Sequence, residues 1–258
     1  MRVVVCVKQS VDVDSVKVSR SSGEITTEGA AYKTNDFDKN ALEEAIKIKE
    51  RTGASVDAVN VGAPTGKDGL KEALALGADR ALYVYDQSIQ QWDSRGVALA
   101  LSRLIKNTGG ADLVLMGEGS VDHYSSQVGP RLAVLLGLPL LCYARKIELE
   151  EKSVTVEKDM EYGVQRVKSP LPALITVVQE INQPRLPTLK SILAASKKEV
   201  RQVGLQELGL SVEEVKPVSR VLHVYPPKSE RKKLVIDGSK PSEAAVRLVG
   251  YLRADGVI

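Results

Sequence analysis

The chain has 258 residues, with 36 lysine and arginine residues against 33 aspartate and glutamate residues and a net charge of +3. Hydrophobic residues at 43% and charged residues at 27% are typical of a globular protein and exclude wholesale disorder. At roughly 100–200 residues per domain, this length predicts one large domain, or one domain with an appendage. The small, scattered basic excess and the aromatic content of 4% argue against nucleic acid as a partner.

The cysteine count and the hydropathy pattern bear on the compartment. The 2 cysteines, Cys6 and Cys142, cannot form a disulfide framework, and Cys6 lies in an apolar run typical of a strand. No apolar stretch approaches the roughly 20 residues that a membrane-spanning helix needs. Residues 1–8 are too short for the apolar region of a signal peptide. We therefore expect a cytoplasmic protein without a membrane span.

The first half of the chain alternates between strand and helix patterns. Residues 3–7 form a continuous, mostly β-branched run, which predicts a strand buried on both faces. A helix follows the polar segment 35–40, where Asn40 stands three residues before Glu43 as in a capping pair. This alternation predicts an α/β, Rossmann-like fold, in which helices cover both faces of a parallel sheet. Further strands are predicted at 56–61, 80–85 and 112–116, and further helices at 66–76, 94–107 and 125–137.

The pattern changes after Pro139. Residues 142–149 and 153–160 resemble an antiparallel hairpin, and 172–178 predict one more buried strand. No strand pattern fits residues 179–201, where a short helix is predicted at 189–195. Near the C-terminus, an edge strand is predicted at 221–225 and an amphipathic helix, starting at Pro241, at 241–253.

Two glycine-rich segments resemble known phosphate-binding loops, but neither has all the residues that its motif requires. Only three residues separate Gly62 from Gly66, and Asp68 stands where a P-loop has a serine or threonine for magnesium. We interpret that segment as a turn from a strand into a helix. The run Gly117-Glu118-Gly119 begins like a dinucleotide fingerprint but lacks its third glycine, which argues against an NAD-type site.

The whole loop Gly117–Pro130 is the better candidate for a ligand site. It follows a predicted strand and leads into a helix, and ligands of open parallel sheets lie beyond the carboxyl ends of the strands. Backbone N–H groups of such a loop bind anions, and Ser125 and Ser126 add hydroxyl donors. The alternative is a polar loop whose serines only cap the helix. The residues by themselves leave both interpretations open.

Other candidates for chemistry are weaker. His123 and His223 have no neighbouring histidine or cysteine with which to share a metal ion, so no metal site is predicted. No nucleophile motif of the G-x-S-x-G type occurs, and no catalytic residue is predicted. The segment 180–195 carries too many apolar residues for a solvated loop, namely Leu186, Leu189, Ile192 and Leu193. They either pack on the domain or anchor a partner protein.

The combination of Val7-Lys8, Asn35–Ala45, Gly117–Pro130 and Asn182–Lys198 resembles the β subunit of electron transfer flavoprotein, end to end. The Asn-x-Pro-Arg-x-x-Thr-Leu segment followed by Lys-Lys is the most specific motif. The resemblance implies a heterodimer with an α subunit that carries the electron-transferring FAD. It also implies an adenine nucleotide α-hydrolase-like domain over 1–180, and over 181–258 a recognition loop and a C-terminal arm that wraps the α subunit.

The resemblance further implies a nucleotide in the β subunit. In most family members this is a structural AMP, whereas in electron-bifurcating members the same pocket holds a second FAD, which takes a hydride from NADH. Carried over by position, the cofactor-binding residues are Cys6, Asn35, Asp36, Phe37, Asp38, Val61, Gly117, Glu118, Gly119, Ser120, Val121, Asp122, His123, Tyr124, Ser125, Ser126, Gln127, Val128 and Gly129.

Two positions in this loop depart from the family pattern, and the first of them favours one nucleotide over the other. AMP-binding relatives have Gln-Thr-Gly where this chain has Gln127-Val128-Gly129, which is similar to bifurcating members. A valine removes a hydroxyl donor and leaves room for a diphosphate, so we expect FAD, with AMP as the alternative. The run His123–Ser126 matches neither group.

Leu189 occupies the position of the recognition-loop leucine, and with Ile192 and Leu193 it is expected to dock a dehydrogenase or quinone reductase.

Two other classes compete with this electron carrier. An enzyme of the ATP-pyrophosphatase type needs a Ser-Gly-Gly-x-Asp loop after the first strand, but Lys8–Asp12 reads Lys-Gln-Ser-Val-Asp. A nucleotide-binding stress or signalling module would explain the α/β half of the chain, but it would assign no function to residues 184–198. We therefore expect an electron carrier whose chemistry belongs to its flavin, with NADH as a further partner if the protein bifurcates.

Overall fold

The computed structural model describes residues 1–19, 23–89, 92–226 and 232–258. The chain divides into two compact units, Met1–Val224 and Tyr225–Ile258. Residues 181–224, which the sequence analysis grouped with the C-terminal arm, belong to the first unit.

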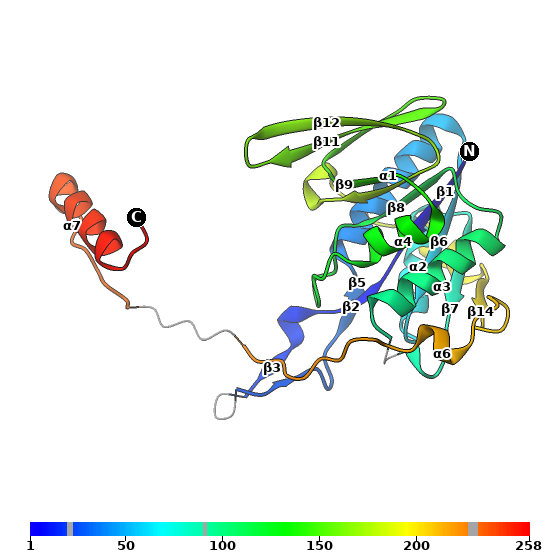
Figure 1. The fold of residues 1–258 in the computed structure, drawn as a ribbon, viewed down its shortest axis with the longest axis horizontal. Helices are drawn as coiled ribbons and strands as arrows, with labels where there is room; N and C mark the ends of the chain where they lie inside the picture. Colours follow the sequence, from blue (N-terminus) through cyan, green and yellow to red (C-terminus); the bar gives the residue numbers. More distant parts are fainter. Residues whose placement is uncertain (20–22, 90–91, 227–231) are drawn as a thin grey trace. The chain divides into compact units, whose positions relative to one another are not determined.

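A seven-stranded parallel sheet forms the centre of the first unit, in the order β14-β7-β6-β1-β8-β13-β9 (Figure 1). In the central strand β1, Val3, Val4 and Val5 are fully buried, which explains the continuous β-branched run in the sequence. The predicted parallel α/β fold is confirmed. The strands are β1 (Arg2–Cys6), β6 (Ser55–Val61), β7 (Arg80–Val84), β8 (Leu113–Gly117), β9 (Leu140–Ala144), β13 (Ala173–Val177) and β14 (Val200–Val203).

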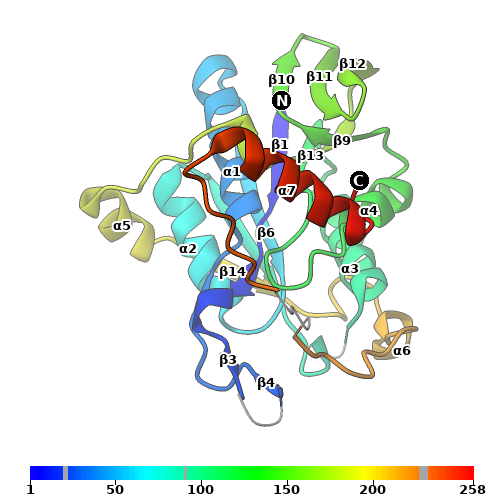
Figure 2. The ribbon, with the colours of Figure 1, turned by 90° about the vertical axis from the view of Figure 1, so that its left-hand side faces the viewer.

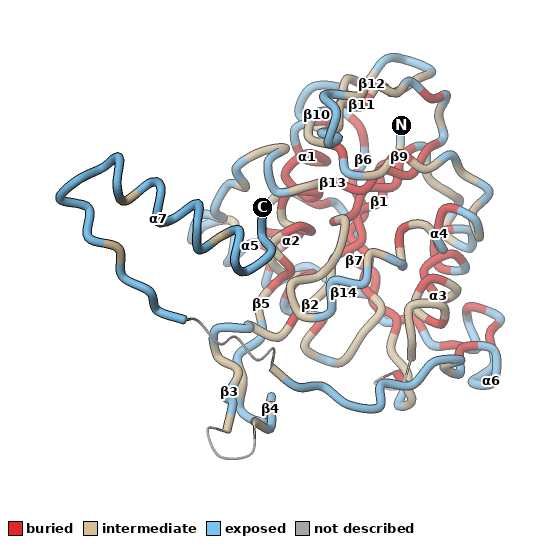
Figure 3. Tube along the Cα trace, turned by 60° about the vertical axis from the view of Figure 1, so that its left-hand side comes forward, coloured by how far each residue is buried: buried red, intermediate tan, exposed pale blue. Residues whose placement is uncertain are grey.

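Helices cover both faces of this sheet. Helices α1 (Asp36–Thr52) and α2 (Gly66–Leu76) pack on the face that carries Val3 and Val5. Helices α3 (Ser94–Asn107) and α4 (Val128–Leu136) pack on the opposite face, which carries Val4 and Cys6. Figure 3 shows the buried residues concentrated along the sheet and on the inner sides of these helices. The alternation of side chains along β1 thus divides the core into two layers.

Two helix starts differ from the predictions. Helix α1 begins at Asp36 with Asn35 as its N-cap, so the predicted Asn40 cap is wrong. Asn40 is buried within the helix, and its amide donates to the carbonyl oxygen of Asn182 at 2.7 Å. Helix α4 begins at Val128 instead of residue 125, because Ser126 adopts a left-handed backbone with φ of 51°.

The predicted hairpin is correct only in its second part. Residues 142–144 belong to β9 of the main sheet, parallel to β13, and Tyr143 has a left-handed backbone with φ of 60°. Antiparallel pairing begins after Arg145, and a third strand that the sequence analysis missed completes the small sheet (Figure 2). These strands are β10 (Lys146–Leu149), β11 (Ser153–Met160) and β12 (Gly163–Pro170).

The segment after β13 also differs from prediction. No strand was predicted over residues 179–201, but β14 begins at Val200 and pairs with β7 at the sheet edge, so the end of that prediction is wrong. The predicted edge strand at 221–225 is absent, since these residues have no regular structure. The helix α5 (Leu189–Ser196) is confirmed. The remaining elements are η1 (Val13–Ser15), η3 (Gln179–Ile181), α6 (Val212–Val215) and the two-stranded pairs β2 (Gln9–Val11) with β5 (Tyr32–Thr34) and β3 (Lys17–Val18) with β4 (Ile25–Thr26).

The second unit contains the predicted C-terminal helix as α7 (Pro241–Ala254), which has no buried residue. Within the described parts of the chain, no helix combines the length and the apolar character needed to cross a membrane.

Candidate functional site

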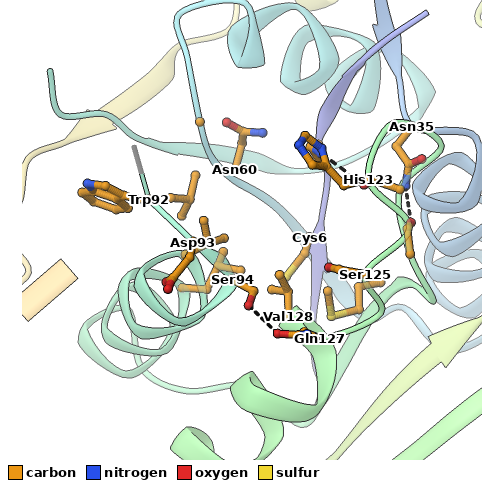
Figure 4. Close-up of a pocket in the computed structure, with 18 of the residues that line it drawn as sticks. Cys6, Asn35, Asn60, Trp92, Asp93, Ser94, His123, Ser125, Gln127 and Val128 are labelled. Atoms are coloured by element: carbon orange, nitrogen blue, oxygen red, sulfur yellow. Dashed lines mark hydrogen bonds between the residues drawn. The ribbon is translucent and has the colours of Figure 1, made fainter. Parts of the chain in front are cut away.

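A cavity of about 1060 Å³ lies at the carboxyl ends of β1, β6 and β8 (Figure 4). The chain builds β1, β6 and β7 outward in one direction, then returns through α3 to place β8 on the other side of β1. Such a reversal of strand order leaves a crevice at the sheet edge, which is where open α/β folds bind ligands. The cavity volume lies just above the roughly 300–1,000 Å³ typical of small-molecule sites.

Most of the predicted cofactor-binding residues lie in the wall of this cavity. Asp36, Phe37, Val121, Asp122 and Tyr124 are the five predicted positions that do not line it. The predicted residues in the wall are Cys6, Asn35, Asp38, Val61, Gly117, Glu118, Gly119, Ser120, His123, Ser125, Ser126, Gln127, Val128 and Gly129.

The start of helix α1 fixes the ends of β1 and β8. One carboxylate oxygen of the buried Asp38 accepts the backbone N–H of Lys8 at 2.9 Å, and the other accepts that of Gly117 at 3.0 Å. Next to it, the Asn35 amide donates to the carbonyl oxygen of Gly119 at 2.8 Å and accepts the Val121 N–H at 3.1 Å. Both side chains therefore hold the loop after β8 in place, as buried backbone groups require partners.

Burial raises the pKa of Asp38 from 3.8 to about 6, although the N–H groups of Lys8 and Gly117 act in the opposite direction. Between these two values the folded chain binds the proton more tightly than the unfolded chain does. The stability contribution of Asp38 is therefore greatest at low pH and is lost as pH rises through about 6.

We expect Asp38→Asn to remove this pH dependence. From pH 4 to pH 7, the wild-type chain should lose roughly 2 kcal/mol of unfolding free energy relative to the variant, because one pKa unit corresponds to about 1.4 kcal/mol. Urea unfolding of both proteins across this range measures the difference. If the two proteins differ in unfolding free energy by the same amount at every pH from 4 to 7, Asp38 does not titrate in this range.

A polar cluster stabilises the middle of the loop. The Lys8 ammonium donates to Asp122 at 2.7 Å and to the hydroxyl of Ser120 at 3.1 Å, and Nδ1 of His123 lies 3.2 Å from Asp122. Burial alone would raise the pKa of Asp122, but hydrogen bonds from His123, Lys8 and Ser120 outweigh it and hold that pKa well below its usual range. The Asp122 charge is thus paired inside the loop, so it does not repel an anionic ligand.

The N-terminus of α4 faces the cavity without a side-chain cap. Gln127 is the N-cap residue and makes no capping hydrogen bond through its side chain. Ser125 and Ser126 therefore do not cap the helix, so that alternative is wrong. The N–H groups of Val128 and Gly129 remain for an anion, whereas Pro130 in the same turn has no N–H. A Cβ on Gly129 would lie 2.8 Å from the Thr176 side chain, so glycine permits this close approach of α4 to β13.

The cavity combines these polar groups with an apolar wall. Val61, Val97, Leu101, Met116 and Val128 line it. A nucleotide needs both kinds of surface, N–H groups and hydroxyls for its phosphates and apolar side chains for its rings. The residues of the wall therefore fit a nucleotide. No group of three histidine, cysteine, aspartate or glutamate side chains suited to a metal ion occurs among the residues described.

Sequence reasoning missed one side of the cavity. Trp92, Asp93 and Ser94 come from the start of α3, and the Ser94 hydroxyl donates to the Gln127 side chain at 2.9 Å (Figure 4). Pro217–Val221 approach from the segment after α6. Asp93-Ser94 is a recognisable helix start, but no local signal relates it to a site near residue 127 or to residues 217–221. Other lining residues missed are Val7, Lys8, Gln9, Tyr32, Val59, Asn60, Gly62, Ala63, Thr65, Gly66, Ile89, Val97, Leu101 and Met116.

The predicted docking residues lie on α5, outside the cavity. Leu189, Ile192 and Leu193 are 73%, 46% and 59% exposed, so the alternative in which they pack on the domain is wrong. The segment before α5 is held to α1 by Arg185, whose guanidinium Nε lies 2.9 Å from Glu43. An apolar surface on a firmly held helix is typical of a protein contact.

Comparison with known proteins agrees with this architecture. Residues 23–208 match the family model of the electron transfer flavoprotein domain. The chain is 34% identical to the electron transfer flavoprotein subunit beta of Bacillus subtilis (strain 168), 35% identical to that of Thermoanaerobacterium thermosaccharolyticum, and 32% identical to the caffeyl-CoA reductase-Etf complex subunit CarD of Acetobacterium woodii. Each similarity covers 100% of both chains. The chain therefore belongs to the electron transfer flavoprotein family, as a β subunit that acts in electron transfer.

Proposed function

We propose that this chain pairs with an α subunit and carries electrons between dehydrogenases and an acceptor, with FAD bound in the cavity at the carboxyl ends of β1, β6 and β8. FAD, when bound, supplies the capacity to accept a hydride from NADH and to release its two electrons one at a time. The protein contributes binding, orientation and electrostatics.

The observation that carries this proposal is the meeting of an uncapped helix N-terminus with an apolar wall in one large cavity. The first turn of α4 and the hydroxyls of Ser125 and Ser126 would hold the phosphates. Val61, Met116 and Leu101 would exclude water from the rings. The hydrogen bonds of Asp38 and Asn35 keep the loop after β8 in position for both tasks.

Two observations favour FAD over AMP. Val128 lines the cavity at the first position of α4, where it offers no hydroxyl to a terminal phosphate. The cavity volume of about 1060 Å³, just above the roughly 300–1,000 Å³ typical of small-molecule sites, also suits a ligand as large as a dinucleotide. AMP remains the second candidate because the Ser125 and Ser126 hydroxyls provide two donors for a single phosphate group. In that case the nucleotide is structural and electrons pass through the α subunit's flavin alone.

The nucleotide can be identified directly. We would purify the full-length chain with its α subunit, denature the complex, and separate and quantify the released nucleotides by chromatography. Two FAD molecules per heterodimer are expected. One FAD and one AMP would instead establish the structural role, and one FAD with no second nucleotide would contradict a nucleotide site in this chain.

Val128→Thr should shift the cavity toward AMP. The new hydroxyl replaces a methyl group of nearly the same size and adds a hydrogen-bond donor to a terminal phosphate, so FAD affinity relative to AMP should fall about tenfold. Competition between the two nucleotides measures the ratio. Val134→Thr is the matched control, because it makes the same change on the same helix at a side chain that is 81% exposed. An unaltered ratio in Val128→Thr would remove the main argument for FAD.

Two apolar surfaces suit the proposed protein partners. The exposed leucines of α5 are proposed to dock the dehydrogenase or quinone reductase. The 34 residues from Tyr225 to Ile258 are too few for a core of their own, and Val246, Leu248 and Tyr251 of α7 are exposed. We propose that the α subunit covers α7.

A further inference from the structure

The segment Pro217–Val221, here called the strap, forms one wall of the cavity without belonging to a helix or strand. The side chains of Val218 and Val221 are 73% and 71% exposed, so apolar packing contributes little to holding the strap against the rest of the domain. Its attachment depends instead on polar contacts with the start of α3.

Asp93 makes the central contact with the strap. One of its carboxylate oxygens accepts the N–H groups of Arg95 at 3.0 Å and Gly96 at 3.1 Å, which caps α3. The other oxygen accepts the N–H of Val218 at 2.9 Å and the hydroxyl of Ser219 at 3.3 Å. One carboxylate thus joins the helix start to the strap. One of its oxygens caps α3 and the other holds the strap, so the two functions can be tested separately.

A second contact holds the approach to the strap. The Arg95 guanidinium donates to the carbonyl oxygen of Glu214 at 3.0 Å and, more weakly, to that of Lys216 at 3.5 Å. Arg95 is not part of the cavity wall. Arg220, on the strap itself, lines the cavity and forms no ion pair with any residue that the structure describes.

We propose that the strap is a removable cover of the cavity, that Asp93 is a positioning residue which keeps it closed, and that Arg220 pairs with a phosphate of the bound nucleotide. This inference rests on the proposed nucleotide site. Because a few hydrogen bonds hold the strap, it can open while the sheet and α3 stay folded, and nucleotide exchange then proceeds through the opening.

Asp93→Asn separates the two functions of the carboxylate. The asparagine oxygen still caps α3, but its amide NH₂ meets the Val218 N–H, donor against donor. We would load the full-length chain with FAD or AMP, dilute it into an excess of competing nucleotide, and follow release. Release should become about tenfold faster, since hydrogen bonds to a charged acceptor are lost. The thermal midpoint should change little.

Further variants separate the cover from other effects. Arg95→Met should also speed release, although its side chain does not line the cavity. Thr188→Val removes a helix cap on α5, far from the cavity, and should leave release unchanged. Wild-type release rates in both Asp93→Asn and Arg95→Met would overturn the strap as a cover. A wild-type chain that binds neither FAD nor AMP would overturn the proposed nucleotide site instead.

The role of Arg220 has its own readout. Arg220→Gln should weaken the binding of AMP about fivefold and leave adenosine, which lacks the phosphate, unaffected. Equal losses for both ligands would assign Arg220 to the shape of the strap and contradict its pairing with phosphate.

Discussion

Arg185→Ala should lower the free energy of unfolding by about 2–3 kcal/mol, because it leaves the buried Glu43 carboxylate without its guanidinium partner, which is itself 38% exposed. Glu43 is only 5% exposed and accepts the Arg185 backbone N–H at 3.1 Å as well as the guanidinium Nε at 2.9 Å. The same guanidinium reaches Glu50 on the next turns of α1 at 3.0 Å. Urea unfolding monitored by circular dichroism measures the loss.

The expected consequence for function follows from the position of Arg185. It lies four residues before Leu189, so its loss should release the start of α5 and slow electron transfer with the partner dehydrogenase. Glu50→Gln tests the exposed half of the ion pair and should leave the free energy of unfolding almost unchanged. Leu189→Ala should leave unfolding unchanged and still slow transfer, since this side chain is 73% exposed. Normal transfer by Leu189→Ala would contradict the docking assignment, and wild-type stability of Arg185→Ala would contradict the buried ion pair.

Gly117→Ala should destabilise the chain by about 3 kcal/mol, at the upper end of the usual cost of overpacking. A Cβ at this position would lie 2.5 Å from Cβ of Phe37 and 2.7 Å from the Asp38 carboxylate. Phe37 and Asp38 belong to the first turn of α1 and cannot yield as a flexible side-chain end can. The end of β8 and the start of α1 must therefore separate, which breaks the Gly117–Asp38 hydrogen bond.

Since that hydrogen bond fixes the loop after β8, nucleotide affinity should fall by more than about tenfold in the same variant. Thermal unfolding and nucleotide titration measure the two effects. Gly204→Ala is the control, because nothing lies within 4 Å of its added Cβ. A Gly117→Ala protein that unfolds and binds nucleotide like this control would show that the contact between α1 and β8 is not tight.

Local sequence patterns predicted most of the sheet. The valines at positions 3–5 form a β-branched run because a central parallel strand is buried on both faces. Buried positions of this kind are occupied by apolar residues, so the strand can be predicted from residue type alone. The end of α1 has a different local cause, since Gly53 adopts a left-handed backbone with φ of 72°, which glycine allows without strain.

The predicted boundaries of helices and strands were wrong where a contact with a distant part of the chain determined the local structure. Asn40 looks like a helix cap, yet its amide bonds to Asn182, which lies 142 residues away. Strand β14 has no apolar run of its own because it lies at the sheet edge, with Arg201 and Gln202 exposed. Its pairing with β7 makes it a strand, and pairing is not encoded in a local pattern.

The sequence by itself determined the fold class, the glycine-rich loop and the family resemblance, because each depends on burial patterns or motifs within short segments. Only the tertiary structure decided the far wall of the cavity. Asp93 and Val218 are 125 residues apart in the chain and meet through one hydrogen bond. The physical reason is the reversal of strand order at β1, which opens a crevice whose walls come from segments that no local interaction relates.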